Sequence, residues 1–269
     1  MKYHLHENGW TVIVDDFDFR EATQQDVNEI AKLIATNTCV LFKNQLLSVD
    51  DEMRISTMFK NPRPFVTPGD DQCTHYWVKG TDGIFQRVTG ELNEHGVGGI
   101  AAHIEDFEWH CNWPSQINRR PIIWLYGVKG TAGSRTSWTN NILSYNDLSQ
   151  EWKDRLENLT FITGDGENDS VAVERKIVHT NIAGKKGLFF PFNQMQHVVD
   201  VSEEENREII NYLSNLIIQD KYCYHHSWTD GDLIISEQWL GIHKRWRFEQ
   251  IATRLLHRGE FDFPDQDYQ

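Results

Sequence analysis

Short apolar runs of strand length, separated by turn-forming residues, are the feature that most constrains the fold of this 269-residue chain. Glycine-rich turns at 129–133 and 183–187 are typical of β-rich architecture. Strands and helices do not alternate regularly along the sequence, which excludes a doubly wound parallel sheet. We therefore expect an α+β fold. Its predicted strands are 39–42, 122–128, 177–179, 187–190, 232–235 and 253–257.

Amphipathic helices are predicted at four places. Thr23 and Ser48 are each followed three residues later by aspartate, and Ser202 precedes three consecutive glutamates. Both patterns favour a helix start, through side-chain capping and the helix dipole. A shorter helix is predicted over 149–156. No repeat, linker or charge block divides the chain, so we expect a single domain over residues 1–269.

The charge balance limits the partners of the protein. With 26 Lys and Arg against 40 Asp and Glu, the net charge is −14, which argues against a nucleic acid polymer as partner. A small basic cluster, Lys244, Arg245 and Arg247, is better suited to a small anion. The apolar runs are far shorter than the roughly 20 residues of a membrane span. We expect a cytoplasmic protein with a small-molecule substrate. The sequence does not decide whether the chain forms a homo-oligomer.

The segment Glu108–Pro114 contains the strongest candidate metal ligands. His110 and Asn112 are two residues apart, so on an extended strand both side chains point to the same face. A second histidine, His243, follows the predicted strand 232–235. Two histidines and one carboxylate are the ligand set of iron(II) oxygenases. Here the third residue is Asn112 instead of aspartate or glutamate.

Two other pairs have similar spacing. His103 and Glu105 form a formally better histidine–carboxylate pair, and His179 with Asn181 repeats the histidine–asparagine pattern. The four cysteines are scattered without a CxxC pair, so a zinc ribbon or a disulfide scaffold is not expected. Spacing alone does not choose among the three histidine pairs.

Over roughly residues 10–262 the chain resembles the taurine dioxygenase family of iron(II)/2-oxoglutarate-dependent oxygenases. Trp109-His-Cys-Asn112 stands where this family has Trp-His-x-Asp. The stretch 121–138 resembles its strand, glycine-rich turn and Thr-x-Trp segment. His243 and Leu255-Leu-His-Arg258 match its distal histidine and co-substrate arginine, fifteen residues apart. Residues 39–52 and 190–202 resemble further family segments.

The resemblance implies a double-stranded β-helix (jelly-roll) core flanked by helices, and an enzyme that uses Fe(II), 2-oxoglutarate and O2. It places His110, His243 and the atypical Asn112 at the metal. Thr136 and Arg258 would bind the co-substrate, Arg258 at its far carboxylate. Arg254 would hold the C1 carboxylate or neutralise the site. The other histidine pairs would have other roles.

Two departures from the family pattern affect these expectations. The stretch Ser236-Glu-Gln238 replaces the usual Trp-Asp-Asn, and Asn112 is a neutral donor at the metal. We expect Asn112 to ligate directly or through water, in a dioxygenase that hydroxylates an aliphatic C–H bond. The alternatives are a radical halogenase with halide at the metal, and a catalytically silent small-molecule-binding relative.

Two further expectations concern residues outside the ligand set. Residues 73–105 precede the metal motif and are expected to line the mouth of the site, with Gln86, Arg87, Glu91 and His95 as polar candidates. His225 and His226 are expected to form an exposed pair before a turn.

Overall fold

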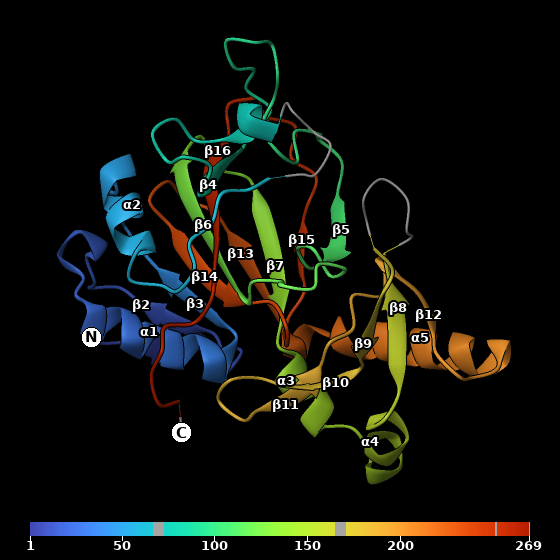
Figure 1. The fold of residues 1–269 in the computed structure, drawn as a ribbon. Helices are drawn as coiled ribbons and strands as arrows, with labels where there is room; N and C mark the ends of the chain where they lie inside the picture. The colour runs from blue at the N-terminus through green and yellow to red at the C-terminus, as the bar shows by residue number, and fades with distance from the viewer. Residues whose placement is uncertain (67–72, 165–170, 251, 269) are drawn as a thin grey trace.

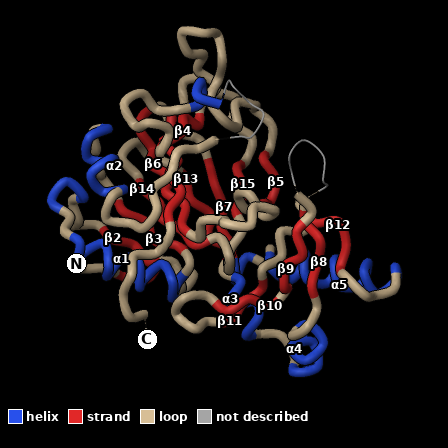
Figure 2. Tube along the Cα trace, viewed as in Figure 1, coloured by secondary structure: helices blue, strands red, loops and turns tan. Residues whose placement is uncertain are grey.

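The structure, a computed structural model, describes residues 1–66, 73–164, 171–250 and 252–268. Strands form the centre of the molecule, with helices α1 (Gln24–Asn37) and α2 (Val49–Ser56) on one flank. Helices α4 (Gln150–Leu156) and α5 (Glu203–Ile217) lie at the other end, as the colouring by secondary structure in Figure 2 makes clear. The predicted mixture of helices and strands is confirmed.

The larger sheet joins segments from the whole length of the chain. Its central strands are antiparallel, and β2 pairs with β3 in parallel. In spatial order the strands are β1 (His4–Leu5), β2 (Val12–Val14), β3 (Cys39–Phe42), β14 (Leu233–Glu237), β6 (Ile122–Lys129), β16 (Leu255–Phe261) and β4 (Phe85–Val88).

A smaller antiparallel sheet packs against the larger one. Leu125 and Ile234 of the larger sheet belong to the same buried cluster as Trp138 and Tyr224 of the smaller sheet. The part of the interior that these residues occupy, between the two sheets, is therefore apolar. The strands of the smaller sheet, in spatial order, are β13 (Cys223–Ser227), β7 (Arg135–Thr139), β15 (His243–Arg245) and β5 (Phe107–His110).

Alternation along the central strands divides the larger sheet into two faces. Ile122, Trp124 and Tyr126 of β6 pack against the helices, whereas Ile123 and Leu125 face the smaller sheet. On β16 the same alternation brings Leu256 into the interior between the sheets and Phe261 into the cluster beneath the helices. Position within a strand thus decides whether a side chain can reach the space between the sheets.

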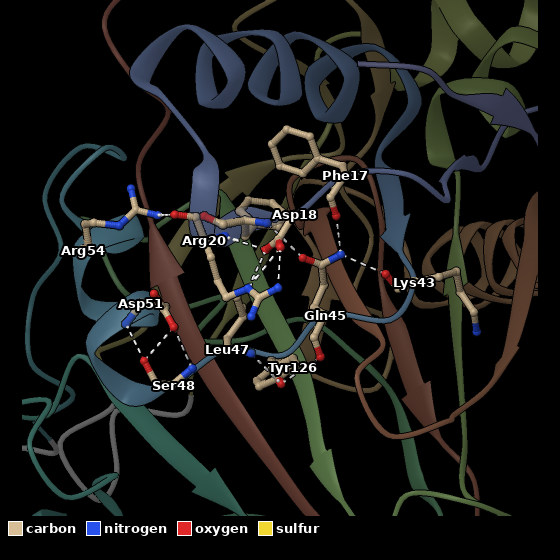
Figure 3. Close-up of polar contacts among 11 residues, drawn as sticks. Phe17, Asp18, Arg20, Lys43, Gln45, Leu47, Ser48, Asp51, Arg54 and Tyr126 are labelled. Atoms are coloured by element: carbon tan, nitrogen blue, oxygen red, sulfur yellow. Dashed lines mark hydrogen bonds and ion pairs between the residues drawn. The ribbon is translucent and has the colours of Figure 1, made fainter.

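Gln45 attaches the N-terminal helical layer to the sheet (Figure 3). Its amide nitrogen donates to the carbonyls of Phe17 and Lys43, and its amide oxygen accepts from the Phe19 N–H. Tyr126 of β6 donates its hydroxyl hydrogen to the Gln45 carbonyl at 3.1 Å. These contacts fix the segment between β3 and α2 against the face of the sheet.

Arg54 of α2 completes this attachment. Its guanidinium donates to the carbonyls of Phe19 and Arg20 in the short helix η1 (Phe19–Glu21), and to that of Ala22. Ser48 and Asp51 form the predicted capping box at the start of α2, and Thr23 and Asp26 form the one at the start of α1.

The remaining elements form a second cluster around α5. Residues such as Phe161, Phe190 and Leu213 make up its buried core. The cluster contains α3 (Asn141–Asn146), the hairpin β10 (Val178–Thr180) and β11 (Lys186–Leu188), and the sheet of β8 (Thr160–Thr163), β9 (Val173–Lys176) and β12 (Met195–Val198). The short helices η2 (Cys73–Tyr76) and η3 (Asp220–Tyr222) complete the described elements.

Three sequence expectations need correction. The strand predicted at 253–257 is β16, which runs on to Phe261. Helix α3 was not predicted; it begins where Asn140 accepts hydrogen bonds from the backbone N–H groups of Ile142 and Leu143. His226 is not exposed but buried in β13, between the Tyr224 hydroxyl and the Asp232 carboxylate. No helix in the described part of the chain is both long and apolar enough to cross a membrane.

Glu237 is an unusual residue at the end of β14. Its side chain is buried, and neither carboxylate oxygen has a hydrogen-bond partner among the described residues. Burial raises the pKa of Glu237 from its ordinary value of 4.5 to about 7, because the charged form loses its hydration.

The raised pKa of Glu237 predicts a pH-dependent stability. The folded chain holds this proton to a higher pH than the unfolded chain, so stability falls as the pH rises from about 4.5 to about 7. The full shift corresponds to about 3 kcal/mol, at roughly 1.4 kcal/mol per pKa unit. Glu237→Gln, which stays neutral, should lose this part of the pH dependence in urea unfolding. Parallel pH profiles for the two proteins would contradict the assignment.

Candidate active site

A cavity of about 50 Å³ lies between the two sheets and collects the residues singled out by their spacing. Strand β15 pairs with β5 so that His243 lies directly opposite His110, with ring centroids 4.1 Å apart. Asn112 and Thr136 also line the cavity, together with three arginines: Arg245, Arg254 and Arg258. All six residues predicted for the metal and the co-substrate are therefore brought together.

Both histidines are held in the form that binds a metal. The Nδ1–H of His110 donates to the Glu108 carbonyl at 2.6 Å, which leaves the lone pair on Nε2. Burial lowers the pKa of His110 to about 4, and burial and the proximity of His110 place the pKa of His243 well below its ordinary value. Neutral imidazole is the ligating form, so neither ring needs to lose a proton near pH 7.

Asn112 lies at a bend just after strand β5. The strand ends at His110, so it does not continue through Asn112 as expected from the sequence. The Asn112 N–H donates to Oε1 of Gln238 at 2.8 Å, and its carbonyl accepts from Nε of Arg119 at 2.7 Å. Gln238 belongs to the atypical Ser236-Glu-Gln238 stretch, and its side chain fixes the backbone of the atypical Asn112.

Arg245 and Arg254 are buried and Arg258 is largely buried, and all three arginines of the cavity have N–H groups without a hydrogen-bond partner among the described residues. Nη1 of Arg254, Nη2 of Arg258, and both Nε and Nη1 of Arg245 have no hydrogen-bond partner among the described residues. Burial lowers the pKa of all three groups, because the charged guanidinium loses hydration there, and the nearby Glu260 offsets this only in part for Arg258. An anion in the cavity would relieve this cost and satisfy the free N–H groups.

The arginines have different surroundings. Nε of Arg254 donates to the Ser134 hydroxyl at 3.1 Å, and Ser134 is two residues from Thr136 on β7. The Thr136 hydroxyl accepts from the Trp228 indole N–H at 2.9 Å, so its own hydrogen remains available. Nε of Arg258 instead donates to Gln86 at 3.2 Å, and the guanidinium lies beside Glu260.

The donor set fits ferrous iron and 2-oxoglutarate. Two neutral imidazoles and an amide oxygen are nitrogen and oxygen donors of the kind that iron(II) accepts. Within the described residues no cluster of three His, Cys, Asp or Glu is present, because the third position of the expected triad is Asn112. The orphaned guanidinium N–H groups match the two carboxylates of the co-substrate.

The two other histidine pairs lie outside the cavity lining. Nδ1 of His103 accepts a hydrogen bond from Nη2 of Arg245 at 3.2 Å, and Glu105 forms an exposed ion pair with Arg247. His179 stacks on Trp239, with ring centroids 4.5 Å apart, and lines a different cavity together with Asn181. The structure thus favours the pair His110 and His243.

The segment 73–105 contributes to the site mainly through apolar residues. Val88, Ile100 and Ala101 line the cavity, whereas the polar candidates Arg87, Glu91 and His95 line a separate surface groove. Among the four polar candidates, Gln86 contacts the cavity residue Arg258 through its side chain, and Arg87 contacts Ile100 through its backbone carbonyl.

Arg245, Gln238 and Glu260 were not assigned to the site from the sequence, although Arg245 was named in a basic cluster suited to a small anion and Gln238 in a departure from the family pattern. Arg245 lies two residues after His243 in β15, so strand alternation could have placed it on the same face. Glu260 has the same relation to Arg258 in β16. The contact of Gln238 with Asn112 joins positions 126 residues apart, and no local pattern signals it.

The sequence of this chain is similar to those of known proteins. The sequence profile described as "Taurine catabolism dioxygenase TauD, TfdA family" matches residues 4–259. The chain belongs to this family. It is 22% identical to the alpha-ketoglutarate-dependent 2,4-dichlorophenoxyacetate dioxygenase of Cupriavidus pinatubonensis over 263 residues, which cover 91% of this chain and 92% of that relative.

Solved structures of other TauD/TfdA-like proteins share the fold. AAD-2 in complex with Mn(II) and N-oxalylglycine superposes with a TM-score of 0.81 at 16% identity, covering 98% of this chain and 99% of AAD-2. A taurine dioxygenase from Burkholderia xenovorans gives 0.77 at 18% identity, covering 95% and 86%. The prediction of a 2-oxoglutarate-dependent dioxygenase using Fe(II), 2-oxoglutarate and O2 is thereby confirmed.

The contact between Gln238 and Asn112 predicts that loss of the Gln238 side chain weakens metal binding as well as stability. Gln238→Ala leaves the buried Asn112 N–H unpaired, which should cost about 1–3 kcal/mol of stability and weaken Mn(II) binding about tenfold in calorimetry. Gln45→Ala is the matched control, because it removes an equally buried glutamine far from the cavity. Equal Mn(II) affinities in the two variants would show that Gln238 does not position the site.

Proposed function

We propose that this enzyme hydroxylates an aliphatic C–H bond of a small organic acid, with His110, His243 and Asn112 binding iron(II). The observation that carries the proposal is the pairing of two neutral imidazoles across β5 and β15, beside buried arginines with free N–H groups. Iron, 2-oxoglutarate and O2 together supply the oxidant when bound. The residues of the chain bind, orient and shield these reactants.

We assign the far carboxylate of 2-oxoglutarate to Arg254 and Thr136. Arg254 bonds to Ser134, and Trp228 holds the Thr136 hydroxyl with its hydrogen free, so both donors belong to one hydrogen-bonded group. The sequence expectation gave this role to Arg258 and an accessory role to Arg254. The contacts favour the reverse, since Arg258 lies beside Gln86 and Glu260 instead.

Arg258 and Arg245 are then available for the acid group of the substrate. Arg245 is buried, Arg258 is largely buried, and both line the cavity with N–H groups that have no hydrogen-bond partner among the described residues. Val88, Ile100 and Leu125 supply an apolar wall for the rest of a small molecule. Relatives named for 2,4-dichlorophenoxyacetate and taurine act on small acids, which supports this substrate class.

The arrangement of the sheets supports a double-stranded β-helix core, and we propose that residues 1–269 function as one domain. Helices α1 and α2 cover the outer face of the larger sheet, and Trp109 and Cys223 of the smaller sheet belong to the buried cluster around α5, so the space between the sheets is shielded from water on both sides. Such shielding favours oxidation of the bound substrate over side reactions.

The halogenase alternative requires an open position for halide at the metal. In the proposed site the side chain of Asn112 would occupy that position, and it is held by hydrogen bonds on its backbone and its amide. No observation in the described residues favours a halide over this amide.

The assignment of Arg254 predicts a selective loss of co-substrate affinity. Arg254→Ala removes charge-assisted hydrogen bonds worth about 1.5–3 kcal/mol, so the Kd for 2-oxoglutarate should rise by at least about tenfold in calorimetry with Mn(II) present. Arg258→Ala should raise this Kd less than Arg254→Ala does. Arg247→Ala, which removes an exposed arginine outside the cavity, is the control. If Arg258→Ala raised the Kd more than Arg254→Ala, the far carboxylate of 2-oxoglutarate would belong to Arg258, as expected from the sequence.

Turnover distinguishes the proposed enzyme from a silent binding protein. Under O2 with Fe(II), the wild type should convert 2-oxoglutarate to succinate, and a small-acid substrate should accelerate the conversion and gain one oxygen in its mass. His243→Ala should abolish both readouts, because an imidazole ligand is lost. Succinate formation no faster than in His243→Ala would identify a silent relative, and a chlorinated product would identify a halogenase.

A further inference from the structure

Glu260 is a buried carboxylate directly behind the metal-site position of Asn112. It lies on β16, two residues after Arg258, and therefore faces the space between the sheets. Its Oε1 accepts a hydrogen bond from Nδ2 of Asn112 at 2.8 Å, and both side chains are more than nine-tenths buried. The two residues are 148 positions apart, so this contact is a product of the fold.

This hydrogen bond determines which end of the Asn112 amide faces the cavity. A carboxylate can only accept hydrogen bonds, so the NH2 group must be the end turned toward Glu260. The amide oxygen is then directed elsewhere, and no other described residue donates a hydrogen bond to it. Because Asn112 lines the cavity, its oxygen is available as a donor atom toward the imidazoles of His110 and His243.

Glu260 also supplies charge that the cavity lining lacks. The described lining contains three arginines and two neutral histidines, with no carboxylate. A divalent cation beside these guanidiniums would meet net repulsion, which a carboxylate ligand normally offsets. One hydrogen bond behind Asn112, Glu260 brings a negative charge close to the same place.

The contact with Asn112 is the better-formed of the two that Glu260 makes in the site. Nη2 of Arg258 lies 3.5 Å from the same oxygen and makes no hydrogen bond with it. A role limited to neutralising Arg258 would therefore leave the shorter contact with Asn112 unexplained.

We propose that Glu260 is a positioning residue that turns Asn112 into a metal donor and carries the negative charge normally borne by the ligand itself. The proposal rests on the proposed function, in which His110, Asn112 and His243 bind iron. In this ligand set the negative charge lies on Glu260, the hydrogen-bond partner of Asn112, and not on the residue at position 112 itself. Outer partners of metal ligands commonly change metal affinity by about 10- to 100-fold.

The test exchanges the two groups and measures Mn(II) affinity by calorimetry on the full chain, without turnover. Glu260→Gln keeps the shape and can still accept from Asn112, but removes the charge. Asn112→Asp adds a carboxylate directly against Glu260. The double variant carrying both changes moves the charge into the ligand position and lets the amide at 260 donate back to it.

Three results are expected. Glu260→Gln should weaken Mn(II) binding by about 10- to 100-fold. The double variant should bind at least as tightly as the wild type. Asn112→Asp alone should bind less tightly than the double variant, since two carboxylates in contact repel each other and one must move or take up a proton.

Glu52→Gln is the matched control for loss of a buried carboxylate. Glu52 bonds to His257 and Trp124 on the helix-facing side of the larger sheet, away from the cavity. This variant should change the thermal unfolding temperature without changing Mn(II) affinity. If Glu52→Gln and Glu260→Gln lost the same Mn(II) affinity, the loss would come from the net charge of the protein and not from the contact with Asn112. That result would overturn the proposal.

The remaining outcomes separate this inference from the proposed function. If the wild type bound Mn(II) and Glu260→Gln bound it within twofold, the role of Glu260 would be wrong and the metal site would stand. If His110→Ala did not weaken binding, the metal site itself would be wrong. Should Glu260→Gln not fold, Asn112→Asp and the double variant, which differ only at position 260, supply the same comparison. Equal affinity in those two would again refute the role of Glu260.

Discussion

The pairing of β5 with β15 is the constraint on which the rest of the site depends. Its register sets His110 opposite His243, although the two residues are far apart in the sequence. The burial that this pairing produces also keeps both rings neutral. A shift by one residue would turn one imidazole to the opposite face of the sheet and separate the two ligands. The larger sheet and its helical layer make this register possible by closing the interior from outside.

Charge is the second organising feature. Three buried guanidiniums at the cavity and an acidic surface elsewhere produce a site that attracts small anions while the whole protein carries a net charge of −14. Because Asn112 is neutral, it would not offset the positive charge of a bound divalent ion. The carboxylate of Glu260, behind Asn112, offsets this imbalance without occupying the cavity. The departure from the family pattern at position 112 and the glutamate at position 260 thus form one electrostatic unit.

Much of this arrangement could be predicted from the sequence, because it depends on local patterns. Capping boxes at Thr23 and Ser48 marked the starts of two helices, and the resemblance to the taurine dioxygenase family placed His110 and His243 in one site. The partners of Asn112 could not be predicted. Gln238 and Glu260 reach it from β-strand regions more than 120 residues away, and such contacts depend on sheet order and register. His226 was misjudged for a different reason, since its partner Asp232 is only six residues away and is brought close by the turn after β13.

Anaerobic optical titration with Fe(II) and 2-oxoglutarate tests the central claim most directly. The account predicts a weak charge-transfer band in the visible that saturates at one iron per chain and disappears in both His110→Ala and His243→Ala. A band that survives in either variant, or its absence from the wild type, would contradict the claim that these two imidazoles share one ferrous ion.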